Sequence, residues 1–201
     1  MKKYYIIFIF LLSCCFYYNA IGQSSFSKFK KGIYKDVNEF KNNKPFYTDS
    51  FYIEKSSGFM KLMFGTSGAK IITIDTNGKK KKFKNPWGYC LNNQVYIYFN
   101  HDFHQLHNYG YYCIFDTDVK ARKPGYYYLS SIYIPKSGYY YQILYVVNLN
   151  NGKIIRLNKD NMINIILVDD EILLDKFKNM DNTQDNLIKF VELYNSKHPI
   201  N

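Results

Sequence analysis

The chain has 201 residues, of which 47% are hydrophobic and 21% are charged, and its mean hydropathy is -0.35. This balance excludes a disordered chain and a polytopic membrane protein, and it suffices for one ordinary globular core. The four cysteines are too few for a scaffold held together by disulfides.

The formal charge of +11 raises the question of nucleic-acid binding. Of the 27 basic residues only Arg122 and Arg156 are arginines. Nucleic-acid interfaces depend on the planar guanidinium group, which binds phosphate or guanine through two hydrogen bonds. Ile, Asn, Lys, Tyr and Phe make up 106 of the 201 residues, and all five have A/T-rich codons. The base composition of the gene therefore accounts for much of the charge, and we expect no nucleic-acid partner.

The N-terminal segment is typical of a signal peptide. Two lysines precede an apolar stretch over residues 4–18, and small side chains follow at Ala20 and Gly22. The stretch of about 15 residues is shorter than the roughly 20 residues of a membrane-spanning helix. We expect a signal peptide over residues 1–22, export to the periplasm or the extracellular space, and a single domain over residues 23–201.

A second cleavage site competes with this one. The sequence Leu11-Leu12-Ser13-Cys14 resembles a lipobox, in which Cys14 would carry a lipid and become the mature N-terminus. The apolar segment before Cys14 is short and the residues after it remain apolar, so plain export is the first expectation and a lipoprotein the alternative. Membrane contact is expected only if Cys14 is lipidated.

After this segment, residues 23–31 are expected to form a polar, mobile leader. The sequence Asp36-Val37-Asn38-Glu39 is a capping box, because the first side chain can accept from the backbone of the last one. It predicts a short helix over residues 37–43, which Pro45 ends.

The middle of the chain is predicted to be a β structure. Between residues 50 and 157 apolar residues alternate with polar ones, and β-branched and aromatic residues are frequent. Asn77-Gly78 and Asn151-Gly152 have the sequence of type I′ hairpin turns. Short strands joined by hairpins predict an antiparallel meander or a curled sheet. The expected strands cover residues 51–55, 60–64, 70–75, 79–84, 95–100, 111–116, 126–134, 139–148 and 153–157.

The last 45 residues return to helical spacing. Asn158 can cap a segment over residues 162–167 that fits either a helix or a strand, and Asp169 and Asp170 open a further turn at helical spacing. Asn182 is expected to cap the clearest helix, whose apolar stripe consists of Leu187, Phe190, Val191 and Tyr194. The predicted fold class is therefore α+β, with a predominantly antiparallel β meander or curled sheet, a short N-terminal helix and two to three C-terminal helices.

Short motifs distributed along the chain carry a family resemblance. They are Gly32-Ile33-Tyr34, Phe40-Lys41-Asn42-Asn43-Lys44-Pro45, Trp87-Gly88-Tyr89, Val95-Tyr96-Ile97, Gly110-Tyr111-Tyr112 and Tyr194-Asn195. With them the chain resembles a family of uncharacterised secreted proteins common in the Bacteroidetes. Such relatives usually carry an Asp-Gly turn after Trp-Gly-Tyr, where this chain has Asn92-Asn93. The resemblance implies export and a small β-rich fold, and it implies no activity or catalytic residue.

Candidate catalytic and metal-binding groups are few. His101, His104 and His107 lie three residues apart, but neither a helix nor a strand brings all three to one ion, so no metal site is expected. Asp116 and Asp118 mark a solvated turn more simply than a catalytic pair. The sequence contains no Gly-x-Ser-x-Gly, His-Glu-x-x-His or dinucleotide-binding glycine motif. We therefore expect no cofactor and favour a protein without catalytic activity.

Two features suggest a binding surface. The lysine run over residues 79–82, predicted on an edge strand, either prevents sheet aggregation or contacts anionic lipid or polysaccharide, with Lys79 and Lys81 as candidate contacts. Three tyrosines follow one another at residues 126–128 and again at residues 139–141. Strand alternation directs the middle one of each group, Tyr127 and Tyr140, to the face opposite its neighbours. These rings either pack across strands or are exposed to stack on sugars or partner proteins.

After the signal peptide only Cys90 and Cys113 remain. They form either a disulfide, which would close a loop and contribute about 3 kcal/mol, or two separate buried thiols. Pairing requires that the two strands be neighbours, which the sequence does not show.

These patterns together predict an exported cell-envelope protein that binds a glycan or an envelope protein without catalysing a reaction. The alternative is a hydrolase of envelope or dietary polymers that uses Asp102, His104 and Asp116.

Overall fold

The computed structural model describes residue 26 and residues 28–55, 68–121, 126–129, 132–135 and 139–200, with the backbone alone between residues 118 and 141. The expected signal peptide, the lipobox cysteine Cys14 and the expected strand over residues 60–64 lie outside the described residues.

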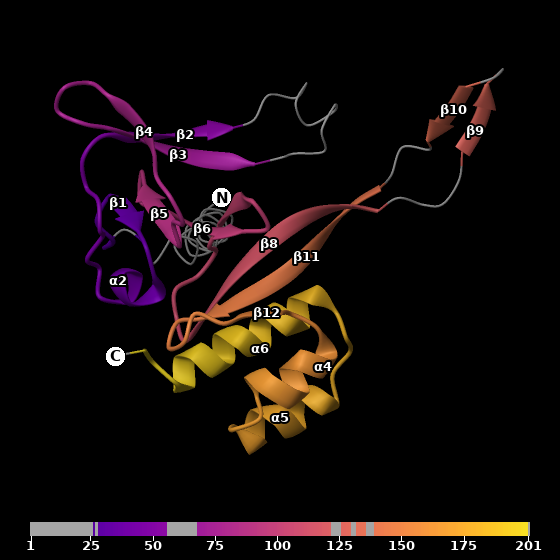
Figure 1. Ribbon diagram of the computed structural model, residues 1–201. Helices are drawn as coiled ribbons and strands as arrows, with labels where there is room; N and C mark the ends of the chain where they lie inside the picture. The colour runs from indigo at the N-terminus through magenta and orange to yellow at the C-terminus, as the bar shows by residue number, and fades with distance from the viewer. Residues whose placement is uncertain are drawn as a thin grey trace, which may run out of the picture.

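The described strands all pair antiparallel, and most of the helical residues follow them at the C-terminal end, so the predicted α+β class is confirmed (Figure 1). The strands are β1 (Gly32–Tyr34), β2 (Phe51–Lys55), β3 (Ala69–Ile74), β4 (Lys80–Lys82), β5 (Gly88–Leu91), β6 (Gln94–Phe99), β7 (Asp102–Gln105), β8 (Tyr112–Ala121), β9 (Tyr126–Leu129), β10 (Ile132–Pro135), β11 (Tyr139–Asn148) and β12 (Ile154–Arg156). The helices are α2 (Val37–Lys41), α4 (Lys159–Asn161), the π-helix η1 (Met162–Ile166), α5 (Glu171–Lys178) and α6 (Gln184–Lys197).

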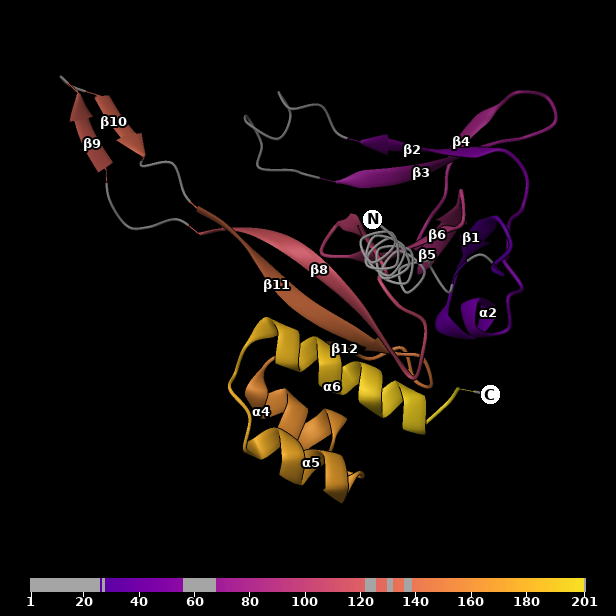
Figure 2. The ribbon, with the colours of Figure 1, turned by 180° about the vertical axis from the view of Figure 1, so that it is seen from behind.

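Most of these elements stack in layers. The sheet β2-β3-β4 forms the first layer, β1-β5-β6-β7 the second, and β12-β11-β8 the third. The C-terminal helices form the fourth layer, against one face of the third sheet. Figure 2 shows the same order from behind, with β2, β3 and β4 at the opposite end from α5 and α6. A hydrophobic core lies between each layer and the next.

Over residues 112–115 of β8 and 144–147 of β11, the third sheet packs on both of its faces. Ile114 and Val146 lie opposite each other and face the helices, whereas the next pair, Phe115 and Tyr145, faces the second sheet. Both alternating rows of side chains must therefore be apolar. This explains why the sequence over residues 143–147 is a continuous apolar run rather than an alternating one.

Aromatic rings fill the core between the second and third sheets. Phe40 of α2 stacks between Phe29, at 4.5 Å between ring centroids, and Trp87, at 4.7 Å. The leader was expected to be polar and mobile, but Phe26 and Phe29 are only 1% and 5% exposed. Asn43 fixes the leader further, because its side chain accepts from Lys30 N at 2.7 Å and donates to Lys28 O at 2.8 Å. This part of the leader therefore belongs to the fold.

Asparagine turns connect the strands of the second sheet. Asn92 and Asn93 have φ angles of 52° and 60°, and Asn100 and His101 have φ angles of 49° and 68°. In both hairpins the flanking residues pair directly, so the loops are two residues long. Both are therefore type I′ turns, in which asparagine is among the few residues that tolerate a positive φ.

The turns that were predicted as type I′ have a different geometry. Asn77-Gly78 joins β3 to β4 and Asn151-Gly152 joins β11 to β12, as expected, but only the glycine of each pair has a positive φ. At the first of them Gly78 N donates to Asp75 O, and Asp75 N donates to Lys79 O. This is a longer loop that ends in a left-handed glycine, so the I′ assignment was wrong while the hairpins themselves are confirmed.

The helices follow the predicted caps with one shift. Asp36 accepts from Glu39 N at 2.9 Å and begins α2, and Asp170 accepts from Leu173 N at 3.0 Å and begins α5. The segment after Asn158, which fitted a helix or a strand, is helical. The cap of α6 is Thr183 rather than Asn182.

Asparagine side chains also complete the outer edge of β8. Asn195 of α6 accepts from Tyr112 N at 2.9 Å and donates to Tyr112 O at 2.8 Å, as a neighbouring strand would. A Cβ atom at Gly110 would lie 2.5 Å from Asn195 Cγ, so the glycine permits this approach. Asn108 accepts from Ile114 N at 2.6 Å on the same edge. The motifs Gly110-Tyr111-Tyr112 and Tyr194-Asn195 are thus two halves of one contact.

The two cysteines of the described chain are separate buried thiols. Cys90 lies on β5 of the second sheet and Cys113 on β8 of the third, so their strands are not paired neighbours. Each thiol lies 3.7 Å from a backbone oxygen, that of Phe29 or of Gly110. Burial raises the pKa of the Cys113 thiol to about 12 and also raises that of Cys90, which keeps both groups protonated and unreactive.

We expect Asn195→Ala to lower the free energy of unfolding by about 2 kcal/mol, because the partly buried backbone of Tyr112 loses both hydrogen-bond partners. Asn179→Ala is the matched control, since it removes an exposed bond to Asp175 O. It should change the free energy by less than about 0.5 kcal/mol. Urea unfolding followed by circular dichroism measures both, and equal effects would contradict the role of the contact.

We expect the thiols of Cys90 and Cys113 to react with Ellman's reagent only when the protein unfolds, since both are buried and protonated. The measurement uses Cys14→Ser/Cys15→Ser protein in urea and in buffer, without reductant. Rapid reaction of either thiol in buffer would contradict the burial. Failure to titrate two thiols in urea would show that a disulfide had formed.

Candidate functional site

The three histidines each have a different local role. His101 is the second residue of the turn between β6 and β7. His104 Nε2 lies 3.1 Å from Phe99 O, and His107 Nε2 lies 2.5 Å from Asp116 Oδ1. Within the residues that the structure describes, no three His, Cys, Asp or Glu side chains gather in a way that could hold a metal ion.

The residues of the hydrolase alternative do not share a site. Asp102 accepts from the neighbouring Phe103 N at 2.8 Å. The ring of His104 is partly exposed and lies 5.9 Å from that of Phe115, which belongs to the core between the second and third sheets. Asp116 follows Phe115 on β8, so its side chain points to the other face of the strand. The structure therefore places His104 and Asp116 on different sides of the third sheet.

A group of charged side chains joins the start of α5 to the end of α6. Asp170 Oδ2 lies 2.9 Å from Lys197 Nζ and 3.4 Å from His198 Nε2. The hydrogen bond from Leu173 N, followed by the one from Lys197, holds the pKa of the Asp170 carboxyl at about 2. The charge of this buried carboxylate is thus neutralised by the residues that it binds.

Tyr194 completes the same junction. Its hydroxyl donates to Asp169 at 2.9 Å, and its ring stacks on His198 at 4.2 Å. Burial raises the pKa of Tyr194, and the hydrogen bond to the Asp169 carboxylate adds to this effect. These contacts fix the start of α5 against the end of α6.

The first sheet has one buried and one open face. On β2 and β3 the side chains of Phe51, Ala69 and Ile71 are at most 8% exposed, and Phe51 and Ile71 pack on the second sheet. The alternate residues point the other way. We call this second set the outer face; it consists of Tyr52, Glu54, Lys70, Ile72, Ile74, Lys80 and Lys82.

The outer face has an apolar centre and a basic border. Tyr52 and Ile72 lie directly opposite each other, and both are partly exposed, as is Ile74. Lys82 lies opposite Ile72 and Lys80 opposite Ile74, on the edge strand β4. Both lysines are exposed, and the Lys80 ammonium lies 5.6 Å from the centre of the Tyr52 ring.

Basic residues predominate over this sheet and its hairpins. Residues 49–55 and 68–84 contain seven lysines and three acidic residues. Glu54 lies opposite Lys70 and offsets its charge. In the described part of the chain, the close contacts between basic and acidic side chains join His107 to Asp116, and Asp170 to Lys197 and His198; none of them involves β4. The lysines of β4 therefore project a positive field into solvent.

The predicted contact residues differ in where they lie. Lys79 is in the turn before β4, and Lys81 lies opposite Thr73, on the face that also carries Ile71. Both are exposed, but it is Lys80 and Lys82 that share a face with Tyr52.

Tyr127 and Tyr140 are placed by their backbones. Tyr127 of β9 lies opposite Ile134, and Tyr140 of β11 lies opposite Lys120. Their side chains lie outside the described part of the structure.

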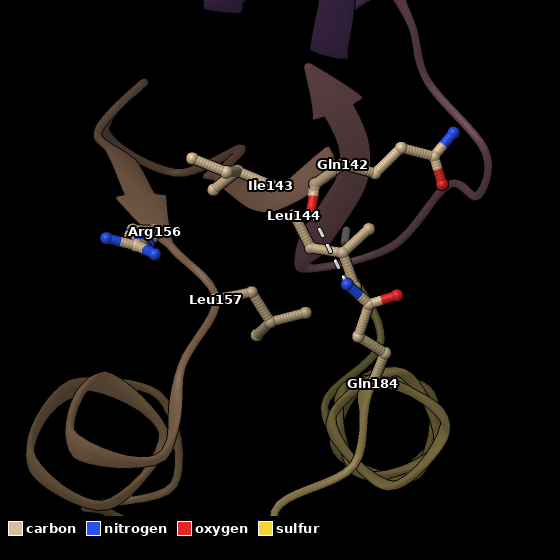
Figure 3. A pocket seen from close by; sticks show the side chains of 6 residues that line it. All are labelled: Gln142, Ile143, Leu144, Arg156, Leu157 and Gln184. Carbon is tan, nitrogen blue, oxygen red and sulfur yellow. Dashed lines mark hydrogen bonds between the residues drawn. The ribbon is translucent and has the colours of Figure 1, made fainter. Parts of the chain in front are cut away.

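A small hollow of about 100 Å³ lies between β11, β12 and the first turn of α6 (Figure 3). It is lined by Gln142, Ile143, Leu144, Arg156, Leu157 and Gln184. Gln184 Nε2 donates to Gln142 O at 3.4 Å across one side of it. Ligand pockets usually enclose about 300 Å³ or more, so we assign no ligand to this hollow.

The sequence did not identify Tyr52, Ile72 and Ile74 as surface residues. All three are apolar residues on correctly predicted strands, and an apolar residue on a strand is most simply assigned to the core. Strand alternation could have identified them as surface residues. Tyr52 shares one face of the sheet with the charged Glu54 and Lys70, whereas Phe51 and Ile71 point to the other face.

We expect the stability of the junction between α5 and α6 to decrease in acid. The pKa of Asp170 falls from 3.8 to about 2 in the folded protein, so its contribution is complete above about pH 4 and is lost as the pH falls toward 2. Asp170→Asn keeps a capping side chain but removes the charge. At neutral pH the parent should have a higher free energy of unfolding than the variant. This difference in free energy should decrease as the pH falls from about 4 to about 2.5. Urea unfolding across this range measures it, and a difference independent of pH would contradict the ion pair.

Neither a curated protein nor a solved structure matches the chain. A family model, described as a family of unknown function (DUF6563), matches residues 32–198. The match begins with β1 and ends just after α6, so it covers all four layers of the fold. The chain therefore belongs to the family of unknown function DUF6563.

Proposed function

We propose that the protein is an exported, non-catalytic binding module of the cell envelope, and that it binds an anionic partner through the lysines of β4 and the outer face. Export is inferred from the basic start and the apolar stretch of the N-terminal sequence.

The observation that carries the binding proposal is the position of the lysines. Four consecutive lysines, residues 79–82, are all exposed at the free edge of a sheet. This sheet is the end layer of the molecule, remote from the C-terminal helices α5 and α6 in both views (Figures 1 and 2). A partner can therefore approach the lysines without displacing another described element.

The same lysines also protect an edge strand from aggregation, and this role does not exclude a contact. Protection alone would be met by lysines that alternate with any polar residue. Here Lys80 and Lys82 instead border partly exposed Tyr52, Ile72 and Ile74, which gives the surface apolar area as well as charge. A basic border around an apolar centre is a common composition of binding surfaces.

The proposal is tested with dextran sulfate, a soluble polyanion, at about 50 mM salt. Lys80→Gln/Lys82→Gln should weaken binding by about five-fold, because each exposed charge contributes on the order of 0.5 kcal/mol. Binding of the parent should decrease as salt is added.

The matched control is Lys176→Gln/Lys178→Gln, which removes the same charge from exposed positions of α5. It should bind almost as the parent does. If both variants weaken binding equally, net charge rather than the lysine strand determines binding, and the proposed surface is wrong.

A further inference from the structure

We propose that the partner of the outer face is the surface of an anionic lipid layer, to which the first sheet binds flat. This inference rests on the proposed function and adds the class of partner. It also differs from the expectation that membrane contact requires a lipid on Cys14.

The first argument is the chemistry of the apolar centre. Ile72 and Ile74 point outward from the same strand, and Tyr52 lies beside Ile72 on the next one. Aliphatic side chains gain free energy on leaving water for the acyl region of a lipid layer. They offer little to a sugar, which is gripped by flat aromatic rings and directed hydrogen bonds. The two isoleucines therefore favour lipid over glycan.

The second argument is the place of the charges. Lys80 and Lys82 flank the isoleucines on the edge strand. The Lys80 ammonium lies 5.6 Å from the centre of the Tyr52 ring, and its long, exposed side chain can turn from there toward the headgroups. Lysine places its apolar stem along a hydrophobic surface and keeps its ammonium group in water. On a lipid layer this arrangement puts the ammonium groups among the anionic headgroups while the isoleucines enter the layer.

The third argument is the type of cation. The surface carries lysines and no arginine. Lysine is a compact, strongly hydrated charge without the planar geometry that reads a single phosphate or carboxylate. Such charges respond to the diffuse potential of an anionic surface, at about 1 kcal/mol for each residue close to it. Among the described residues no helix is long and apolar enough to cross a membrane. The proposed contact is made by a sheet and needs no such helix.

The test uses the processed protein, expressed with Cys14→Ser so that no lipid anchor contributes. Its binding is measured by co-sedimentation with vesicles of phosphatidylcholine, and with vesicles that contain about 30% phosphatidylglycerol. We expect binding to the anionic vesicles and little to the neutral ones. Lys80→Gln/Lys82→Gln should weaken the binding by about 30-fold.

The decisive variant is Ile72→Thr/Ile74→Thr, which keeps β-branched side chains but removes apolar area. It should weaken vesicle binding by roughly ten-fold and leave dextran sulfate binding unchanged. Val168→Thr/Ile172→Thr is its control, since these side chains are 57% and 63% exposed. They lie just before and within α5, which Figure 1 shows at the opposite end of the molecule. The control should bind vesicles as the parent does.

A second measurement needs no variant of the sheet. Apolar contact is not screened by salt, so at about 0.5 M salt the parent should retain part of its vesicle binding while its dextran sulfate binding is lost. This comparison decides the question if the isoleucine variant does not fold, as judged by circular dichroism.

The outcomes separate the two proposals. Binding to dextran sulfate but not to anionic vesicles overturns the lipid inference and leaves the lysine surface in place. The lipid inference is also overturned if the folded Ile72→Thr/Ile74→Thr variant binds vesicles as well as the parent does. It is overturned too if added salt abolishes vesicle binding together with dextran sulfate binding. Failure to bind either probe overturns both proposals.

Discussion

The packing of β8 and β11 on both faces, over residues 112–115 and 144–147, is the constraint on which much of the structure depends. A strand pair with apolar side chains on both sides must be covered twice, here by the helices on one face and by the second sheet with its aromatic core on the other. The outer edge of β8 is then completed by the side chains of Asn108 and Asn195, together with one antiparallel bridge between Leu106 and Phe115. The sheets, the leader and the C-terminal helices are all arranged around this pair.

Local patterns in the sequence predicted much of the fold. The strands over residues 51–55 and 139–148 have the predicted bounds, because alternation and β-branched residues are strong signals there. The strands β1, β5 and β7 were missed, since each is only three or four residues long and contains glycine or polar residues. The residues predicted as one strand over 126–134 form two, β9 and β10. The order of the sheets depends on contacts between distant residues, which no local pattern contains.

The candidate surface, like the fold, could be predicted from the sequence only in part. An exposed lysine strand next to the Asn77-Gly78 hairpin could be read from the sequence, and the structure has it there. Which lysines act together depends on register, because a shift of one residue moves every side chain to the other face. Lys79 and Lys81 were chosen, whereas Lys80 and Lys82 share the face of Tyr52. Similarly, Phe26 and Phe29 looked like part of a polar leader because only tertiary packing buries them.

The layered order also has an energetic consequence. A separate core cluster joins each layer to the next, so we expect the stability of the molecule to resemble a sum of nearest-neighbour terms, as in a repeat protein. The lysine-bearing sheet and the helical layer are separated by two sheets and share none of the described core residues. Substitutions at these two ends should therefore be additive. Evolution could alter the surface of one end without compensating changes at the other.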